Sequence, residues 1–168
     1  MGMVFELIAT PVHTYRTIVA HSKTLGLKTA STDEKILASF YKIKEANPDW
    51  ATDTDKSWDM ILACFSDGAN RHASTSILSA SLLGEDLLGK KASIHGLRPR
   101  LVKRVAAALE DYDAANVAKI IPSLEPDEVY CVTGDEDIPY VTENIEALRK
   151  FYTKAASDNR CVIAVLNV

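Results

Sequence analysis

The sequence predicts a helix-rich α+β fold in a single domain, residues 1–168, with a small sheet that includes the N- and C-terminal strands. Of the 168 residues, 47% are hydrophobic and 25% are charged, which is typical of a folded globular domain. Short β-forming runs stand near both ends of the chain, at residues 3–9 and 161–166. Between these runs, apolar residues recur at the spacing of amphipathic helices.

The first part of the chain predicts one strand followed by three helices. Residues 3–9 are largely apolar, and Thr10-Pro11 then has the composition of a helix start. We expect this first helix to end near His21. The second helix ends before Pro48, and the third carries an apolar stripe over residues 58–65.

The second part of the chain mixes helices with strands. Apolar residues between 77 and 83 suit a buried helix, whereas glycines at 84, 89 and 96 indicate a loop-rich stretch. The remaining expected elements, in chain order, are a strand at 92–95, helices from 99 and over 114–121, a strand at 129–132, a long helix after 139 that ends at 159, and a strand at 161–166. We expect the first and last strands to be neighbours.

Cysteine usage and the N-terminal residues indicate a reducing, cytoplasmic location. The chain has Cys64, Cys131 and Cys161 and no C-x-x-C motif, which excludes a thioredoxin-like centre and a zinc ribbon. Because each cysteine lies among apolar residues, we expect three buried thiols. Residues 1–6 lack the basic region of a secretion signal, and no apolar run approaches the ~20 residues of a membrane helix.

One stretch has the glycine spacing of a phosphate-binding loop but not its chemistry. In residues 84–91, Lys91 stands where a hydroxyl should bind magnesium. Glu85 and Asp86 would also place negative charge inside the phosphate cradle. We therefore interpret this stretch as a loop without a nucleotide.

No metal or cofactor is expected. Acidic residues alternate over 53–59 as at the start of a calcium loop, but Trp58 and Cys64 occupy the positions that need glycine and glutamate. These acids suit a helix N-terminus instead. The four histidines have no metal-ligand spacing.

A cluster of polar residues and a basic segment form one candidate site. Asp67, Arg71 and His72 are close in sequence, so folding could assemble them. Residues 90–104, the basic segment, carry six basic side chains and no acidic one. Together these groups suit a small-molecule or phosphate-handling enzyme, which is the alternative function. The candidate ligand-binding residues are Asp67, Arg71, His72, Lys90, Lys91, Arg98 and Arg100.

The second candidate surface is the acidic segment, residues 125–137. Its acids are Glu125, Asp127, Glu128, Asp135, Glu136 and Asp137. Such a surface suits a basic protein partner, so the leading hypothesis is a non-enzymatic protein-binding domain of the inhibitor or immunity type. Nucleic acid is disfavoured, because the net charge is −4 and the basic segment contains no aromatic residue. The alternative is that the acidic and basic segments are solvated or pair with each other.

Several short motifs carry a resemblance over nearly the whole chain. They are Met1-Gly2-Met3, Asp55-Lys56-Ser57-Trp58, the run 97–102, and the run 151–156 followed by the strand 162–166. On these motifs the chain resembles the YfbM-like family, a bacterial domain of unknown function. The resemblance implies an α+β fold and a bacterial cytosolic origin, and it implies no reaction. In the family the third helix carries histidines after the tryptophan, where this sequence has Asp59 and Leu62, so a histidine-dependent family activity would be absent here.

Overall fold

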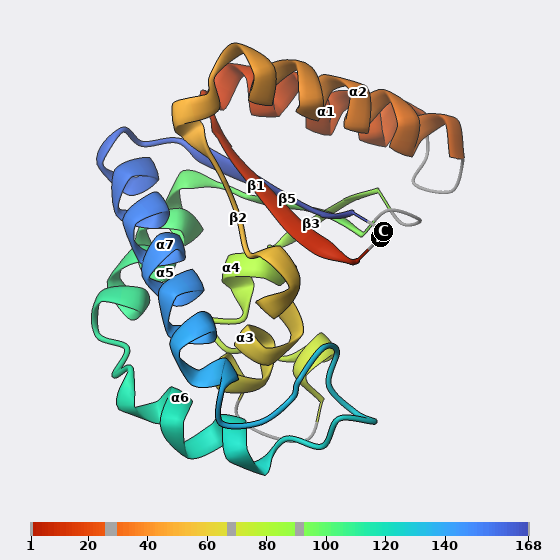
Figure 1. Ribbon diagram of the computed structural model, residues 1–168. Coiled ribbons are helices and arrows are strands. Elements are labelled where there is room, and N and C mark those ends of the chain that lie inside the picture. Colours follow the sequence, from red (N-terminus) through yellow and green to blue (C-terminus); the bar gives the residue numbers. More distant parts are fainter. Residues whose placement is uncertain (1, 26–29, 67–69, 90–92, 168) are drawn as a thin grey trace.

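The computed structural model describes residues 2–25, 30–66, 70–89 and 93–167, which form an antiparallel sheet with helices on both faces (Figure 1). The sheet has five strands in the order β2-β1-β5-β4-β3. They are β1 Val4–Thr10, β2 Ala51–Asp53, β3 Asp86–Gly89, β4 Ile94–Leu97 and β5 Cys161–Asn167. The predicted α+β class is confirmed.

The centre of the sheet is the pair of strands from the two ends of the chain. β1 and β5 are antiparallel neighbours from Val4↔Asn167 to Thr10↔Cys161, which confirms the expected pairing. Because side chains alternate along a strand, Leu7 contributes to the core on one face and Ile8 to the core on the other. Both faces of these strands are covered, which explains their nearly continuous apolar sequence.

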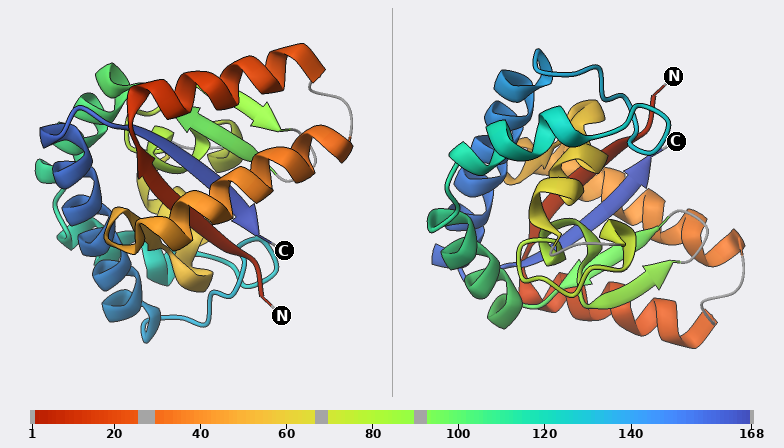
Figure 2. Two further views of the ribbon diagram at one scale, coloured as in Figure 1. Left: turned by 90° about the horizontal axis from the view of Figure 1, so that it is seen from above. Right: turned by 90° about the horizontal axis from the view of Figure 1, so that it is seen from below.

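Helices α1 (Val12–Leu25) and α2 (Ala30–Ala46) form a hairpin over one face of the sheet (Figure 2). Tyr15 and Phe40, which are almost fully buried, pack there against the sheet residue Ile163. The first helix continues four residues beyond its expected end, whereas the second ends before Pro48 as expected.

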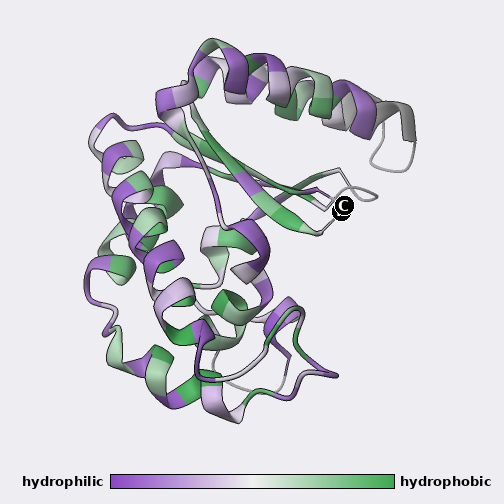
Figure 3. Cartoon of the chain, viewed as in Figure 1, coloured by the Kyte–Doolittle hydropathy of each residue, from purple (hydrophilic) through white to green (hydrophobic). Residues whose placement is uncertain are grey.

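The other face of the sheet is covered by the remaining helices and holds the larger hydrophobic core. Figure 3 shows hydrophobic residues on the strands and on the inner sides of these helices. Tyr152, which is fully buried, donates a hydrogen bond to the Ser81 carbonyl at 2.6 Å. These helices are α3 Trp58–Phe65, α4 Ala80–Leu83, α5 Pro99–Glu110, α6 Ala115–Ile120 and α7 Asp137–Ser157.

An arginine ties the end of α5 to α7. Arg149 donates from Nε to the Leu109 carbonyl at 2.7 Å and from Nη2 to the Tyr112 carbonyl at 2.9 Å. These carbonyls lie at and just beyond the helix end, where no intrahelical donor remains. None of the helices in the described parts of the chain is both long enough and apolar enough to cross a bilayer.

Two expectations about loops and thiols were wrong. Gly89 and Gly96, expected in a loop-rich stretch, lie in the antiparallel strands β3 and β4, and the strand expected at 92–95 overlaps β4. Cys131 is exposed, whereas Cys64 and Cys161 are buried as expected. The left-handed backbone of Asn159, with φ of 52°, agrees with the expected end of the last long helix.

Gly96 is required by the close approach of Tyr15 from α1. A Cβ atom at residue 96 would lie 2.2 Å from Tyr15 Oη and 2.8 Å from its Cε2. The Tyr15 hydroxyl donates to Asp86 Oδ2 at 2.8 Å, so it cannot move away without losing this bond. Glycine at this position therefore lets α1 lie close to the sheet.

We predict that Gly96→Ala destabilises the protein by about 1–3 kcal/mol, the usual cost of overpacking a filled site. Chemical denaturation measures this change. In the double variant Gly96→Ala/Tyr15→Ala part of the added cost should disappear, because the clashing ring is gone. Equal effects of Gly96→Ala in the presence and absence of the Tyr15 ring would contradict this explanation.

Candidate functional site

The carboxylate of Asp59, in the first turn of α3, is the centre of the candidate site. It is the only charged side chain of this helix, and it is 4% exposed. A buried carboxylate without partners is strongly unfavourable, so its contacts decide whether the helix can pack here. Its position near the helix N-terminus contributes a smaller favourable interaction.

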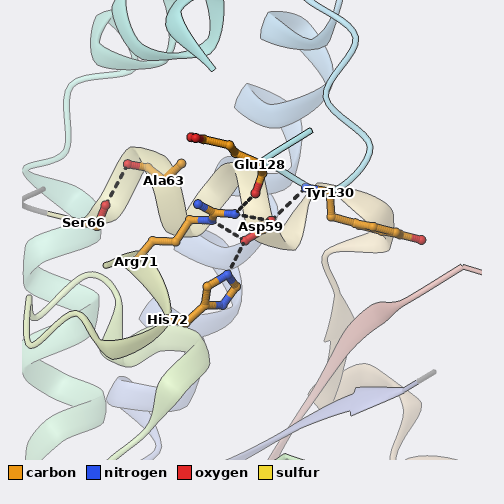
Figure 4. A network of polar contacts seen from close by, with 7 residues as sticks. All are labelled: Asp59, Ala63, Ser66, Arg71, His72, Glu128 and Tyr130. Carbon is orange, nitrogen blue, oxygen red and sulfur yellow. Dashed lines mark hydrogen bonds and ion pairs between the residues drawn. The ribbon is translucent and has the colours of Figure 1, made fainter. Parts of the chain in front are cut away.

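Three residues surround this carboxylate (Figure 4). Arg71 donates from Nε to Oδ1 at 2.6 Å and from Nη2 to Oδ2 at 2.9 Å. The backbone N–H of Tyr130 donates to Oδ2 at 2.8 Å, and His72 Nε2 lies 3.3 Å from Oδ1. The hydrogen bonds from Arg71 to Asp59 are the main cause of a raised pKa at Arg71.

The same contacts join segments that are distant in sequence. Arg71 and His72 belong to the 3₁₀ helix η3, Arg71–Ala73, whereas Tyr130 belongs to the acidic segment. Arg71 also donates to the backbone carbonyl of Glu128. The Tyr130 hydroxyl in turn accepts a hydrogen bond from the backbone N–H of Met3, at 2.9 Å, just before β1. The Asp59 carboxylate therefore holds both η3 and part of the acidic segment against the first turn of α3.

This network explains why the expected strand at residues 129–132 is wrong. These residues form turns, and Cys131 has a left-handed φ of 60° that interrupts an extended chain. The Tyr130 N–H, which a strand would use in a ladder, is bound to the Asp59 side chain instead. The apolar side chains Val129 and Val132 are still buried.

A pocket of about 380 Å³ lies beside the Asp59 network. Its polar side chains are those of His72, His95, Ser74 and Ser93, and Gly84 also lines it. The apolar lining residues are Phe5, Trp58, Leu62, Ala73, Leu83 and Leu166. A pocket that combines an apolar wall with converging polar groups can bind a small molecule.

Trp58 forms the aromatic wall of this pocket. Its ring centroid is 5.8 Å from that of His72 in an edge-to-face arrangement, and 5.9 Å from that of Tyr130 in a stacked one. Trp58 is 5% exposed and belongs to the hydrophobic core, which confirms a packing role. Among the described residues its buried indole N–H has no hydrogen-bond acceptor.

The two histidines of the pocket differ in environment. His95, on β4, is largely buried, and this burial lowers its pKa, so its imidazole is neutral at pH 7. The His72 side chain is 51% exposed and contacts Asp59 through Nε2. A proton on Nε2 is needed for this contact, and the Nδ1 lone pair is then available to accept a proton.

Ser74 is held as a hydrogen-bond donor toward the pocket. Its hydroxyl accepts from the Ser76 backbone N–H at 3.2 Å and from the Ser79 hydroxyl at 3.0 Å. With both acceptor positions occupied, its own proton remains for a further acceptor. Among the parts of the chain that the structure describes, no group of three or more His, Cys, Asp or Glu side chains could hold a metal ion.

The structure brings together only some of the candidate ligand-binding residues. Arg71 and His72 meet at Asp59, and His72 lines the pocket. Arg98 lies elsewhere, paired with Asp86 at 2.8 Å, and Arg100 is exposed on α5. The other candidates, Asp67, Lys90 and Lys91, lie outside the described residues.

The acidic segment is largely free of internal partners. Asp137 is the exception, because it accepts hydrogen bonds from the Thr133 and Gly134 backbone N–H groups and closes the turn before α7. The other five acids are exposed, and none forms an ion pair with a described residue. They are Glu125, Asp127, Glu128, Asp135 and Glu136. No ion pair between described residues joins this segment to the basic segment; Arg98 pairs with Asp86 instead.

Asp59, His95 and Ser74 are site residues that sequence reasoning missed. One signal for Asp59 was present, since it is the single charge in the otherwise apolar run from Trp58 to Phe65. A charge on the buried face of a helix needs a partner, and Arg71 is the next basic residue after it. No local pattern indicated that His95 would face the same pocket.

We predict that Asp59→Asn lowers the free energy of unfolding by about 3 kcal/mol or more, because it leaves Arg71 without its buried partner. It should also speed hydrogen exchange at the Tyr130 amide. Chemical denaturation and exchange NMR measure these two effects. Glu143→Gln, at an exposed position on α7, is the matched control and should change stability by less than about 0.5 kcal/mol. Equal stabilities of the two variants would refute the central role of Asp59.

Comparison with known proteins supports the fold and leaves the activity open. The family model "Domain of unknown function (DUF1877)" matches residues 1–165. The crystal structure of YfbM, a protein of unknown function from Escherichia coli, aligns with 98% of this chain and 99% of its own, at 16% identity and a TM-score of 0.65. At this identity the likeness shows the fold alone. No curated protein matches the sequence significantly. The YfbM-like resemblance is thus confirmed, and the chain belongs to the family described as domain of unknown function DUF1877.

Proposed function

We propose that this domain binds a small polar molecule in the pocket beside Asp59 and exchanges a proton with it through His72. The contact between His72 Nε2 and the Asp59 carboxylate at the pocket wall is the observation that carries the proposal. Asp59 orients the imidazole through Nε2, which leaves Nδ1 as the nitrogen that can accept a proton from the ligand. A histidine oriented by a carboxylate is a common acid–base arrangement.

The lining of the pocket indicates the kind of ligand. The Ser74 hydroxyl supplies a donor, and the neutral His95 supplies a donor and an acceptor. The indole of Trp58 and the side chains of Leu62 and Leu83 supply an apolar wall. We therefore propose a ligand with an apolar or ring-shaped face and hydrogen-bond acceptors, of a size that fits about 380 Å³.

The family resemblance adds support. The two positions at which it places histidine in other members are Asp59 and Leu62 in this chain. Asp59 holds the polar network, and Leu62 lines the pocket. Both positions therefore belong to the proposed site, although this chain uses different side chains there.

We predict that small carboxylic acids, amides, sugars or nucleosides found to bind by ligand-observed NMR will bind His72→Gln and Ser74→Ala about tenfold more weakly. This factor corresponds to the loss of one hydrogen bond to the ligand. His13→Gln, at an exposed position on α1, is the matched control and should keep full affinity. If a proton is exchanged through the imidazole, ligand binding to the wild type should depend on pH, and this dependence should be absent from His72→Gln. Compounds that bind the wild type and His72→Gln equally, or no binder in the set, would contradict the proposal.

A second candidate function is the binding of a basic protein, as an inhibitor or immunity-type domain would do. The observation that favours it is the exposure of five acids in the acidic segment, none of which forms an ion pair with a described residue. Charges of one sign that lack internal partners raise the association rate of an oppositely charged protein. The alternative, in which the acidic segment pairs with the basic segment, is weakened because Arg98 of the basic segment is already paired with Asp86.

For this second candidate we predict that a bacterial extract contains a basic protein that the wild type captures at low salt and releases at moderate salt. A variant with serine at residues 125, 127, 128, 135 and 136 should associate with it more slowly and lose most of the salt dependence. The control variant neutralises five other exposed acids: Glu34, Glu45, Asp49, Glu110 and Asp111. Surface plasmon resonance measures the rates. If both variants behave alike, the acidic segment is not the binding surface.

A further inference from the structure

A second pocket, of about 490 Å³, lies between α1, the start of α5 and the start of β5. It is separate from the pocket beside Asp59, and the two share no lining residue. Most of its wall is apolar and comes from Val12, Val19, Ala20, Pro99 and Cys161. Its polar lining consists of Tyr15 and two arginines, Arg16 and Arg98.

The two arginines have free hydrogen-bonding capacity. Arg16 is exposed on α1, and its guanidinium group makes neither a hydrogen bond nor an ion pair with a described residue. Arg98 uses Nε and Nη2 to bind Asp86, at 3.1 and 2.8 Å, which leaves Nη1 without a partner in the described structure. A guanidinium group with unused donors is well suited to bind a carboxylate or a phosphate.

The acidic groups near this pocket are already engaged. Asp86 accepts from Arg98 and from the Tyr15 hydroxyl, and Glu85 accepts from the Arg98 backbone N–H at 2.8 Å. The charge of Arg16 is therefore not neutralised locally. Other basic side chains stand further along α5, at Arg100, Lys103 and Arg104, and they add positive charge to this side of the molecule.

The buried thiol of Cys161, which lines the pocket, is affected by the same charges. Burial raises the pKa of Cys161 to about 11, and Glu85 and Asp86 act in the same direction. Arg16 and Arg98 oppose this rise, so both guanidinium groups lie close enough to act on the thiol that lines the pocket. At 1% exposure, the thiol itself is part of the apolar wall.

We propose that this second pocket binds an organic anion, with the carboxylate or phosphate group between Arg16 and the free edge of Arg98. The apolar part of the anion lies against Val12, Val19 and Pro99. An apolar cavity of this size with charged groups at one side matches the usual anatomy of a site for such a molecule. The site is independent of the function proposed for the pocket beside Asp59.

The test uses four probes: hexanoate, hexyl phosphate, 1-hexanol and inorganic phosphate. Together they separate the contribution of the anionic head group to binding from that of the apolar chain. NMR titration at constant ionic strength gives a dissociation constant for each. We expect hexanoate, hexyl phosphate or both to bind at least about tenfold more tightly than hexanol and inorganic phosphate. Which of the two anions binds more tightly identifies the preferred head group. The proposal is overturned if hexanol binds as tightly as the anions, or if none of the probes binds.

Variants locate the binding site. Arg16→Gln removes a guanidinium group that makes no hydrogen bond or ion pair with a described residue, so the fold should persist. The affinity for the anion should fall about tenfold. Arg104→Gln, an exposed position outside the pocket, is the charge-matched control and should leave affinity within about twofold. His72→Gln should also leave it unchanged, which separates this site from the pocket beside Asp59. An unchanged affinity in Arg16→Gln would place the anion elsewhere and refute the assignment.

Discussion

The buried carboxylate of Asp59 is the constraint on which the arrangement around the first pocket depends. A buried charge on an otherwise apolar helix is tolerated only when other groups compensate for the loss of water. Arg71, the Tyr130 N–H and His72 provide this compensation from two other segments. Those segments have little regular secondary structure of their own, so their positions relative to α3 depend on the same carboxylate.

The two-sided sheet decides where polar chemistry can occur. Because β1 and β5 are buried on both faces, most of their side chains are apolar, and the charged side chain of Glu6 is already paired with Lys44. Polar groups gather instead where loops and helix ends meet the margins of the sheet. The pocket beside Asp59 and the pocket between α1 and α5 are both of this kind. Each has an apolar wall and a few polar groups, which come from η3, β4 and loops in the first pocket and from α1 and the residue before α5 in the second.

The basic and acidic segments differ in how their charges are paired. In the described part of the basic segment, Arg98 is engaged by the adjacent acids Glu85 and Asp86, which hold the start of α5 against β3. In the acidic segment, Arg71 attracts Glu128, but five carboxylates are exposed and none forms an ion pair with a described residue. Among the described residues no ion pair joins these two segments of opposite charge, so the expected alternative of internal pairing gains no support there.

The sequence by itself determined the secondary structure wherever a long apolar period controls burial. The two terminal strands, the helices around Phe40 and Tyr152, and the α+β class all follow from side-chain spacing that local rules can read. Side-chain spacing gave a wrong prediction at residues 129–132, because the Tyr130 N–H binds the distant Asp59 carboxylate. It also gave a wrong prediction at Gly96, where the close approach of Tyr15 requires glycine. The candidate site was only partly visible: Arg71 and His72 are neighbours in sequence, but Asp59 and His95 reach them only through the tertiary fold. Ion pairs and pockets join residues that are far apart along the chain, so they are decided by packing and by the burial of charge, which no local pattern encodes.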